Sequence, residues 1–182
     1  MTLPKLEESQ ITQIAAWVAE YIDAQRQGFS PGASNLDTKQ KAVMQPFFPA
    51  SVLDSTKLVV LSGQHVSNPP FYPKLKEMGF DLAAVPDFSQ MGAITFVDTV
   101  VSHEPFSDGL LFHELVHVVQ YEKLGLNHFA DKYVRGFLTG GSYEAIPLEK
   151  NAYQLGARFE AKPTEAFSAE DEVEEWIDFG LF

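Results

Sequence analysis

The sequence predicts an α+β fold, in which a small, mainly antiparallel sheet packs on one apolar helix. Residues 93–101 contain alternating branched and aromatic side chains, a pattern that is typical of a strand. Residues 6–27 carry apolar residues at helical spacing, and a further helix is expected over 108–124, which contains an apolar run with two histidines four residues apart. Because 182 residues suffice for one substantial core, we expect a single domain over 1–182.

The first 92 residues predict a helical and mixed region. A helix over 6–27 ends near Gly28, and 30–37 reads as a loop because it combines Pro, Gly, Ser, Asn and Asp. Further short elements are a helix at 38–45, a strand at 56–62 and a helix near 72–78. Four prolines interrupt residues 64–91, so no long element is expected there.

Residues 93–161 predict the functional core. After the strand at 93–101, Gly125 terminates the helix at 108–124, and Asn127 is placed to cap a helix over 128–138. Pro147 suits the first turn of a helix over 147–161. The acidic tail at 162–182 is expected to end in one more short helix.

Composition narrows the class of protein. Hydrophobic residues make up 45% of the chain and aromatic residues 13%, which indicates a globular protein. The absence of Cys excludes disulfides and thiolate metal ligands. A net charge of −12 argues against nucleic acid and anionic membranes as partners. The N-terminal residues show no apolar signal core and no stretch is long enough to span a membrane, so we expect a cytoplasmic protein.

The most informative motif is His113-Glu114-Leu115-Val116-His117, an HEXXH sequence inside an apolar run. Four residues of helix make slightly more than one turn, so both imidazoles leave the same face and can hold one zinc ion. Glu114 lies about 100° round the helix from His113, where it can reach a metal-bound water without being a ligand. This pattern predicts metal-assisted hydrolysis.

A third protein ligand is needed for such a site. Glu149 is the preferred candidate, because it falls in the first turn of the helix at 147–161, with the small Ala152 one turn further on. Glu144 is the alternative, although it precedes Pro147 and is expected in a turn. His128 and His103 are the remaining histidines near the motif in the sequence. His128 is interpreted as a capping or surface residue, and His103 as a loop or substrate-side residue.

The stretch Tyr143-Glu-Ala-Ile-Pro-Leu-Glu149-Lys-Asn-Ala-Tyr153, downstream of HEXXH, resembles the gluzincin pattern of zinc metallopeptidases. It is similar to small bacterial gluzincins, including the minigluzincins and the short-HEXXH domain of unknown function found with bacterial toxins and contractile injection systems. The resemblance covers about residues 93–160 and none of the first 90. It implies a zincin-like fold and a zinc site of His113, His117 and Glu149.

If active, the protein is expected to hydrolyse peptide bonds in a peptide or protein substrate, with zinc-activated water and Glu114 as general base. Tyr143, Tyr153 and His128 are candidates for stabilising the oxyanion, although Tyr153 equally suits packing beside the metal helix. Gln120 could orient a ligand or simply pack between helices. The alternative hypothesis is a zinc-binding, zincin-fold module without peptidase activity, such as a binding, carrier or toxin-associated domain.

Overall fold

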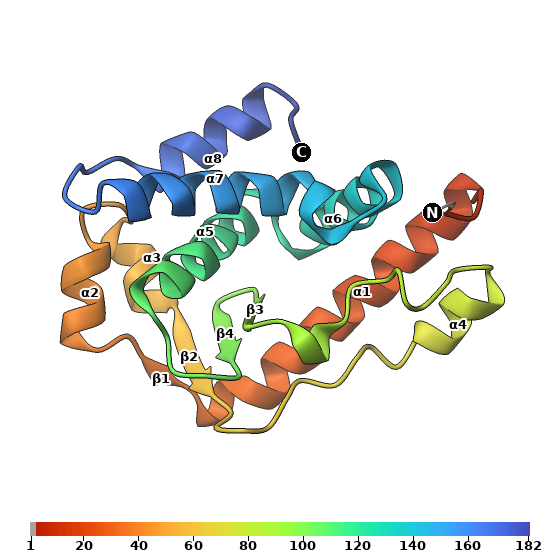
Figure 1. Ribbon diagram of the computed structural model, residues 1–182, viewed down its shortest axis with the longest axis horizontal. Coiled ribbons are helices and arrows are strands. Elements are labelled where there is room, and N and C mark those ends of the chain that lie inside the picture. Colours follow the sequence, from red (N-terminus) through yellow and green to blue (C-terminus); the bar gives the residue numbers. More distant parts are fainter. Residues whose placement is uncertain (1–2) are drawn as a thin grey trace.

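The computed structural model describes residues 3–182, which form an α+β fold with eight α-helices and one four-stranded sheet (Figure 1). The helices are α1 (Glu8–Phe29), α2 (Thr38–Met44), α3 (Ala50–Ser55), α4 (Tyr72–Glu77), α5 (Asp108–Leu124), α6 (Leu126–Gly140), α7 (Pro147–Ala161) and α8 (Ala169–Asp178). The strands are β1 (Ser34–Asn35), β2 (Lys57–Val60), β3 (Ala93–Phe96) and β4 (Thr99–Ser102). Short 3-10 turns cover Ser30–Gly32, Phe88–Gln90 and Tyr143–Ala145.

The sheet is mixed, which corrects the expectation of a mainly antiparallel one. Its order is β1-β2-β4-β3, and β2 pairs with β4 in parallel while the two outer pairings are antiparallel. The parallel pair aligns Lys57 with Thr99 and Val60 with Ser102. Because β3 is last in this order, it forms the edge of the sheet that lies beside α5.

The single strand predicted at 93–101 is wrong: these residues form the tight hairpin of β3 and β4, with Ala93 opposite Ser102. The turn at Val97 and Asp98 lacks the Gly or Asn that usually signals such hairpins. Val97 adopts a left-handed φ of 63°, which is unfavourable for a β-branched residue. Tertiary contacts compensate, because Arg26 of α1 forms a two-pronged ion pair with the Asp98 carboxylate.

The N-terminal helix begins two residues later than predicted. Glu7 and Gln10 form a reciprocal capping box that fixes the start of α1, and the helix continues through Gly28 to Phe29. The predicted helices at 38–45 and 72–78 and the strand at 56–62 are present with slightly shifted ends. Helix α3 was not predicted, and β1 occupies two residues of the predicted loop at 30–37.

Two helices carry the predicted motif residues and have the predicted bounds. The Ser107 hydroxyl caps α5 by accepting the Leu110 N–H, and Gly125, with φ 73°, ends it. Helix α7 begins at Pro147, as expected for a proline in the first turn. The prediction that Asn127 caps the next helix is wrong, because α6 already begins at Leu126, directly after Gly125.

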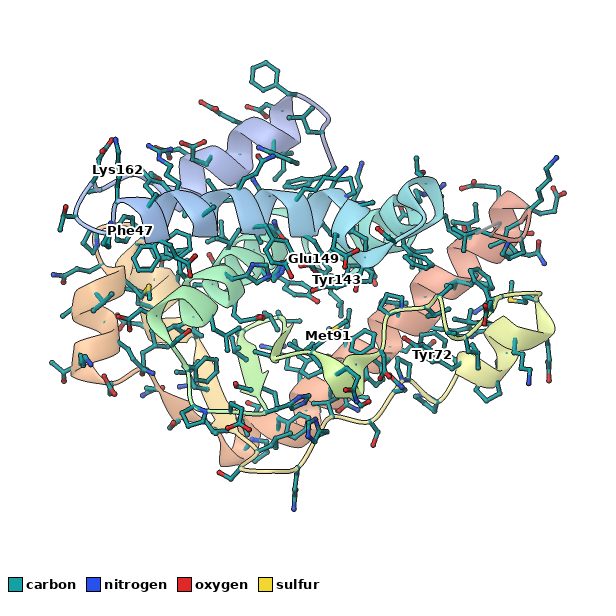
Figure 2. All side chains as sticks on the ribbon, viewed as in Figure 1. Phe47, Tyr72, Met91, Tyr143, Glu149 and Lys162 are labelled. Atoms are coloured by element: carbon teal, nitrogen blue, oxygen red, sulfur yellow. The ribbon has the colours of Figure 1, made fainter. Side chains whose placement is uncertain are left out.

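Buried apolar residues form two clusters, one on each side of α5. Helices α2, α3, α7 and α8 surround one side of α5, whereas α1 and α6 pack together on the other side of the molecule (Figures 1 and 2). Phe112 of α5 stacks on Phe159 of α7, which fixes how these two helices meet. Within residues 3–182, none of the helices combines the length and apolarity needed to cross a membrane.

Candidate metal centre

His113 and His117 point from the same face of α5, as their spacing predicts. Their Nε2 atoms lie 3.1 Å apart, and both side chains are largely withdrawn from solvent. The helix is buried on nearly every face from Leu111 to Tyr121, so the two imidazoles are held by packing along the whole helix. This rigidity preorganises the pair for a shared ligand.

Glu149 reaches the histidine pair from the first turn of α7. Its Oε2 lies 3.4 Å from His113 Nε2 and 3.3 Å from His117 Nε2. The other candidate, Glu144, lies on the exposed turn Tyr143–Ala145 and does not belong to this group. The structure therefore brings together the three residues that the sequence favoured, and Ala152, fully buried, allows α7 to lie close to α5.

The spacing of these three atoms fits a tetrahedral metal ion. Zinc bonds of 2.0–2.1 Å at tetrahedral angles separate neighbouring ligand atoms by about 3.3 Å. The three separations of 3.1, 3.3 and 3.4 Å fall around that value. Moreover, Glu149 Oε2 is buried and receives no hydrogen bond from any residue in 3–182. A buried carboxylate oxygen without a donor is costly, and a cation would satisfy it.

Electrostatics at this centre favour a cation. Burial would raise the pKa of Glu149, but the two histidines outweigh burial and hold that pKa well below its usual range. Burial would likewise lower the pKa of His117, whereas the Glu149 carboxylate reverses this and raises the pKa to about 9. Glu149 is therefore ionised at neutral pH, and its negative charge is only 4% exposed.

Gln120 fixes the orientation of His117. The Gln120 amide nitrogen donates to the Leu148 carbonyl (3.0 Å) and to Asn151 Oδ1 (2.9 Å), so its oxygen faces His117 Nδ1 at 2.8 Å. Because an amide oxygen only accepts, Nδ1 must carry a proton, so Nε2 is the nitrogen of His117 that would bind a metal, and it would release its own proton on doing so. Of the two roles considered for Gln120, the structure favours orientation of His117 and shows that it also joins α5 to α7.

Glu114 lies beside the three candidate ligands without joining them. Its side chain is 4% exposed and borders the open cleft described below. The Thr95 hydroxyl of β3 donates to Glu114 Oε2 at 2.7 Å, and it also lies 3.2 Å from the Glu114 carbonyl. The edge strand therefore holds the carboxylate in position next to the histidine pair.

The two candidate tyrosines occupy different positions. Tyr153 is 50% exposed, and its ring packs against His113 at a centroid distance of 4.6 Å, which agrees with the packing role considered for it. Tyr143 is less exposed and lies near Glu149, as Figure 2 shows. Burial raises the pKa of Tyr143 strongly, and the Glu149 charge raises it further, so its hydroxyl stays protonated and able to donate.

The other two histidines lie apart from the metal group. His128 is exposed, and its Nδ1 lies 3.1 Å from the Leu124 carbonyl at the end of α5. This position agrees with the capping or surface role expected for it. His103 is buried directly after β4, where its Nε2 accepts the Val66 N–H at 3.0 Å. It therefore holds the chain around Val66 against the sheet.

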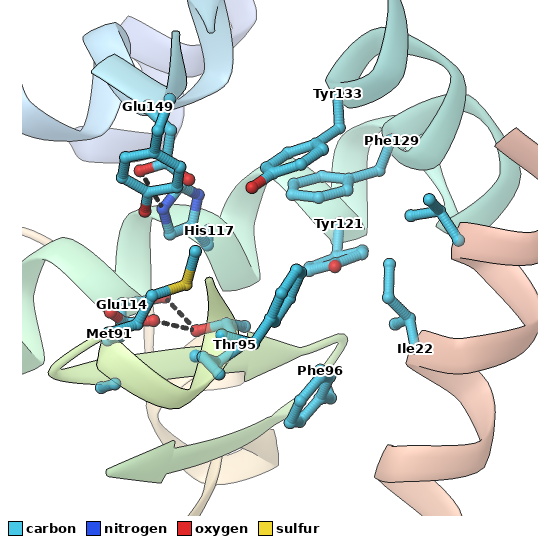
Figure 3. A pocket seen from close by; sticks show the side chains of 15 residues that line it. Ile22, Met91, Thr95, Phe96, Glu114, His117, Tyr121, Phe129, Tyr133 and Glu149 are labelled. Atoms are coloured by element: carbon cyan, nitrogen blue, oxygen red, sulfur yellow. Dashed lines mark hydrogen bonds and ion pairs between the residues drawn. The ribbon is translucent and has the colours of Figure 1, made fainter. Parts of the chain in front are cut away.

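Two cavities meet at Glu114. An open cleft of about 710 Å³ runs between β3 and α7 and includes His113, Glu114 and Tyr143. A smaller pocket of about 50 Å³ shares Glu114 with the cleft and also includes His117 and Glu149 (Figure 3). A cleft therefore lies between the start of β3 and the helix at 147–161, and of the three candidate ligands His113 lines it, whereas His117 and Glu149 line the smaller pocket.

Thr95 and Asn151 belong to the site although the sequence did not single them out. Thr95 occurs in a strand pattern in which threonine is ordinary, and only the hairpin geometry directs its hydroxyl to Glu114. Asn151 lies two residues after Glu149, and its contact with Gln120 depends on how α7 crosses α5. A fully buried polar pair between two helices is a signal that only the three-dimensional structure reveals.

No family model, no curated protein and no solved structure matches this chain.

Proposed function

We propose that this protein is a zinc-dependent metallopeptidase with a zincin-like arrangement, in which His113, His117 and Glu149 hold the metal. The observation that carries the proposal is the geometry of three ligand atoms at tetrahedral separations, two of them on buried residues, with a second carboxylate, Glu114, beside them. Two imidazoles and one carboxylate are a ligand set that suits zinc and leaves one coordination position open for chemistry.

The residues around the centre supply the steps that peptide hydrolysis needs. When bound, zinc would polarise a water molecule and the substrate carbonyl. Glu114 would accept a proton from the attacking water and deliver it to the leaving amine as the C–N bond breaks. Thr95 holds one oxygen of Glu114, so the carboxylate needs little reorganisation during these transfers.

Tyr143 is the proposed donor to the oxyanion that develops on the substrate carbonyl. It borders both the open cleft and the smaller pocket, so its ring stands where the two meet at Glu114. Its hydroxyl is protonated at neutral pH and partly shielded from water, which strengthens a hydrogen bond to developing negative charge. Tyr153, half exposed and packed on His113, is the weaker candidate.

The shape of the cleft favours a polypeptide substrate. The cleft is bounded on one side by residues 86–93, which lead into the edge strand β3, and on the other by α7, and it includes His113 and Glu114. An extended peptide can add to a free sheet edge as a further strand, through main-chain hydrogen bonds. Such binding would bring successive peptide bonds to the metal centre through main-chain contacts.

The decisive experiment compares the wild type with Glu114→Gln. Purified protein is loaded with zinc and incubated with casein, and new N-termini are counted with and without a chelator. We expect cleavage by the wild type that the chelator abolishes, and a loss on the order of 10²–10⁴ in rate for Glu114→Gln. Glu114→Gln should keep the full zinc content, because Glu114 is not one of the candidate ligands.

Each other outcome has a definite meaning. Equal cleavage by the wild type and Glu114→Gln would exclude Glu114 as the general base. Stoichiometric zinc without cleavage of casein or of unstructured peptides would favour the alternative, a zinc-binding module without peptidase activity. Absence of bound zinc from the wild type, at micromolar zinc, would contradict the proposed centre itself.

A further inference from the structure

The smaller pocket and the open cleft differ in volume, and this difference bears on substrate choice. Met91, Ala93, Glu114 and Tyr143 line both cavities, so the two are neighbours at the place where Glu114 would act. The cleft, at about 710 Å³, has room for a peptide main chain, whereas the pocket, at about 50 Å³, has room only for a small group. A peptide in the cleft can therefore place one side chain in the pocket.

The pocket away from the metal centre is apolar. Its far wall combines Val18 and Ile22 of α1 with aromatic rings of α5 and α6. Figure 3 shows Ile22 on one side, and Phe129 and Tyr133 on the other, directed into the same space. Apart from the residues of the metal centre, none of the pocket-lining residues carries a charge. An apolar group gains from entering such a space, and a charged one loses its hydration.

The size of the pocket limits which apolar group fits. A cavity of about 150 Å³ is known to accommodate benzene, and one water molecule takes up about 30 Å³ of the liquid. The pocket, at about 50 Å³, is a third of the benzene-binding size. It therefore accommodates a short aliphatic side chain, such as that of Val, and excludes the ring of Phe.

A second apolar cavity of about 50 Å³ lies behind the pocket, between α1, α4 and α6. Val18, Phe88 and Tyr133 line both cavities and thus form the partition between them. Phe88 also packs edge-to-face on Tyr21, and Tyr133 stacks near Phe129, so these two rings support the surrounding structure. Val18 is the smallest member of the partition.

We propose that the smaller pocket selects a short aliphatic side chain next to the bond to be cleaved, and that Val18 limits the length of that side chain. This inference rests on the proposed function, because the selected residue is defined relative to the metal centre. It also gives a role to the N-terminal helix, whose residues Val18 and Ile22 form the wall opposite the metal.

The test uses peptides of one sequence that differ at a single position, occupied by Ala, Val, Leu or Phe, and measures kcat/KM for zinc-loaded protein. We expect the wild type to favour Val over Phe by roughly tenfold or more, the range found for mismatched apolar groups. Val18→Ala removes part of the partition, so the ratio of kcat/KM for the Phe peptide to kcat/KM for the Val peptide should rise at least tenfold. Ile22→Phe fills the pocket, so this variant should favour Ala.

Ile14→Val is the matched control, because Ile14 lines only the second cavity. Its side-chain preference should equal that of the wild type. Ile22→Phe changes the preference in the opposite direction to Val18→Ala, so a folding defect in either variant leaves the other as a test. Unchanged preferences in both Val18→Ala and Ile22→Phe would overturn the inference.

A binding measurement separates this inference from the peptidase proposal. Valine hydroxamate and phenylalanine hydroxamate chelate zinc and each carry one of the two side chains, and calorimetry gives their affinities without turnover. We expect the wild type to bind the valine compound more tightly and Val18→Ala to narrow or reverse that difference. If these affinities are found but no peptide is cleaved, the peptidase proposal is refuted and the selective pocket stands. If peptides are cleaved but both compounds bind equally, only the selective pocket is refuted.

Discussion

The two walls of the site are built on different principles. The wall formed by α5 and α7 consists of polar groups fixed by hydrogen bonds, such as the chain from His117 through Gln120 to Asn151. The opposite wall, formed by α1 and the segment before β3, consists of apolar side chains held by ring contacts. Tyr21, for example, contacts Phe88 at 5.6 Å and Phe96 at 6.0 Å.

Because of this difference, the two walls should tolerate different amino-acid substitutions. A metal centre requires particular atoms at separations fixed to a few tenths of an ångström, so a single substitution on the α5–α7 wall removes function. An apolar wall requires volume and shape, and many side chains of similar size satisfy both. Substitutions on the α1 wall should therefore change which substrate is accepted, whereas those on the α5–α7 wall should change whether the chemistry occurs.

The largest effect is expected from the third candidate ligand. Glu149→Ala reduces the three-ligand site to two histidines, so zinc content should fall from about one per chain to near zero. Glu144→Ala is the matched control, since it removes a carboxylate five residues away that is exposed, and it should keep the zinc. Elemental analysis after dialysis measures both. The reverse ranking would assign the ligand to Glu144 and contradict the geometry described above.

Next in size is the effect of removing a phenol hydroxyl at the mouth of the pocket. Tyr143→Phe should lower kcat by roughly 10²–10³, the typical cost of losing one oxyanion donor, while zinc content stays constant. Tyr153→Phe makes the same chemical change on a half-exposed ring and should lower kcat less than tenfold. Steady-state kinetics on one peptide compares them. If Tyr153→Phe proves the more damaging, the oxyanion role passes to Tyr153.

A smaller effect is expected from Gln120, which touches His117 and not the metal. Gln120→Leu removes the acceptor of the His117 Nδ1 proton, and zinc affinity should weaken by roughly 10–100-fold, as for other residues that orient a ligand. Gln120→Glu keeps an acceptor at that place and should retain more of the affinity. Gln154→Leu, on the exposed side of α7, serves as control. Competition with a chelator of known affinity yields the zinc dissociation constant of each variant. Values equal to that of the wild type for all three variants would contradict an orienting role for Gln120.

The contrast between the walls also explains what the sequence could predict. The bounds of α5 and α7 and the grouping of His113, His117 and Glu149 followed from local rules, namely helix periodicity, a terminating glycine and a proline in a first turn. The metal-binding role of these residues remains a prediction. Their signal is strong because the chemistry demands rare residue types at fixed spacing.

The opposite wall carried no comparable signal. Val18 and Ile22 look like ordinary members of an amphipathic helix, and only the fold brings them opposite the metal centre. The hairpin of β3 and β4 was missed for a related reason, because Val97 and Asp98 do not form a recognisable turn sequence. Arg26, 72 residues earlier, holds that turn, and such a distant contact cannot be read from local pattern.

The smallest predicted effect tests that distant contact. Asp98→Asn removes the ion pair with Arg26, which joins α1 to the hairpin that carries Thr95. Because the pair is only partly buried, the loss should be about 0.5–1 kcal/mol in the free energy of unfolding at pH 7. Burial acts to raise the pKa of Asp98, but the Arg26 hydrogen bonds outweigh it and lower the pKa below the usual value. A lowered pKa stabilises the fold above the pKa of the unfolded chain, near 3.9, and this contribution is lost as the pH falls through the folded value.

The difference between the wild type and Asp98→Asn should therefore be present at pH 7 and should shrink below about pH 4. Urea unfolding in the presence of a chelator measures it without any contribution from zinc. Asp54→Asn is the matched control, because the Asp54 side chain, which pairs with Lys41, is 67% exposed whereas that of Asp98 is 29% exposed, and this variant should change stability less. A difference that persists unchanged at pH 3 would show that Asp98 acts through the shape of the turn and not through its charge. In that case the strained Val97, and not the ion pair, would be the feature that ties the apolar wall to the edge strand.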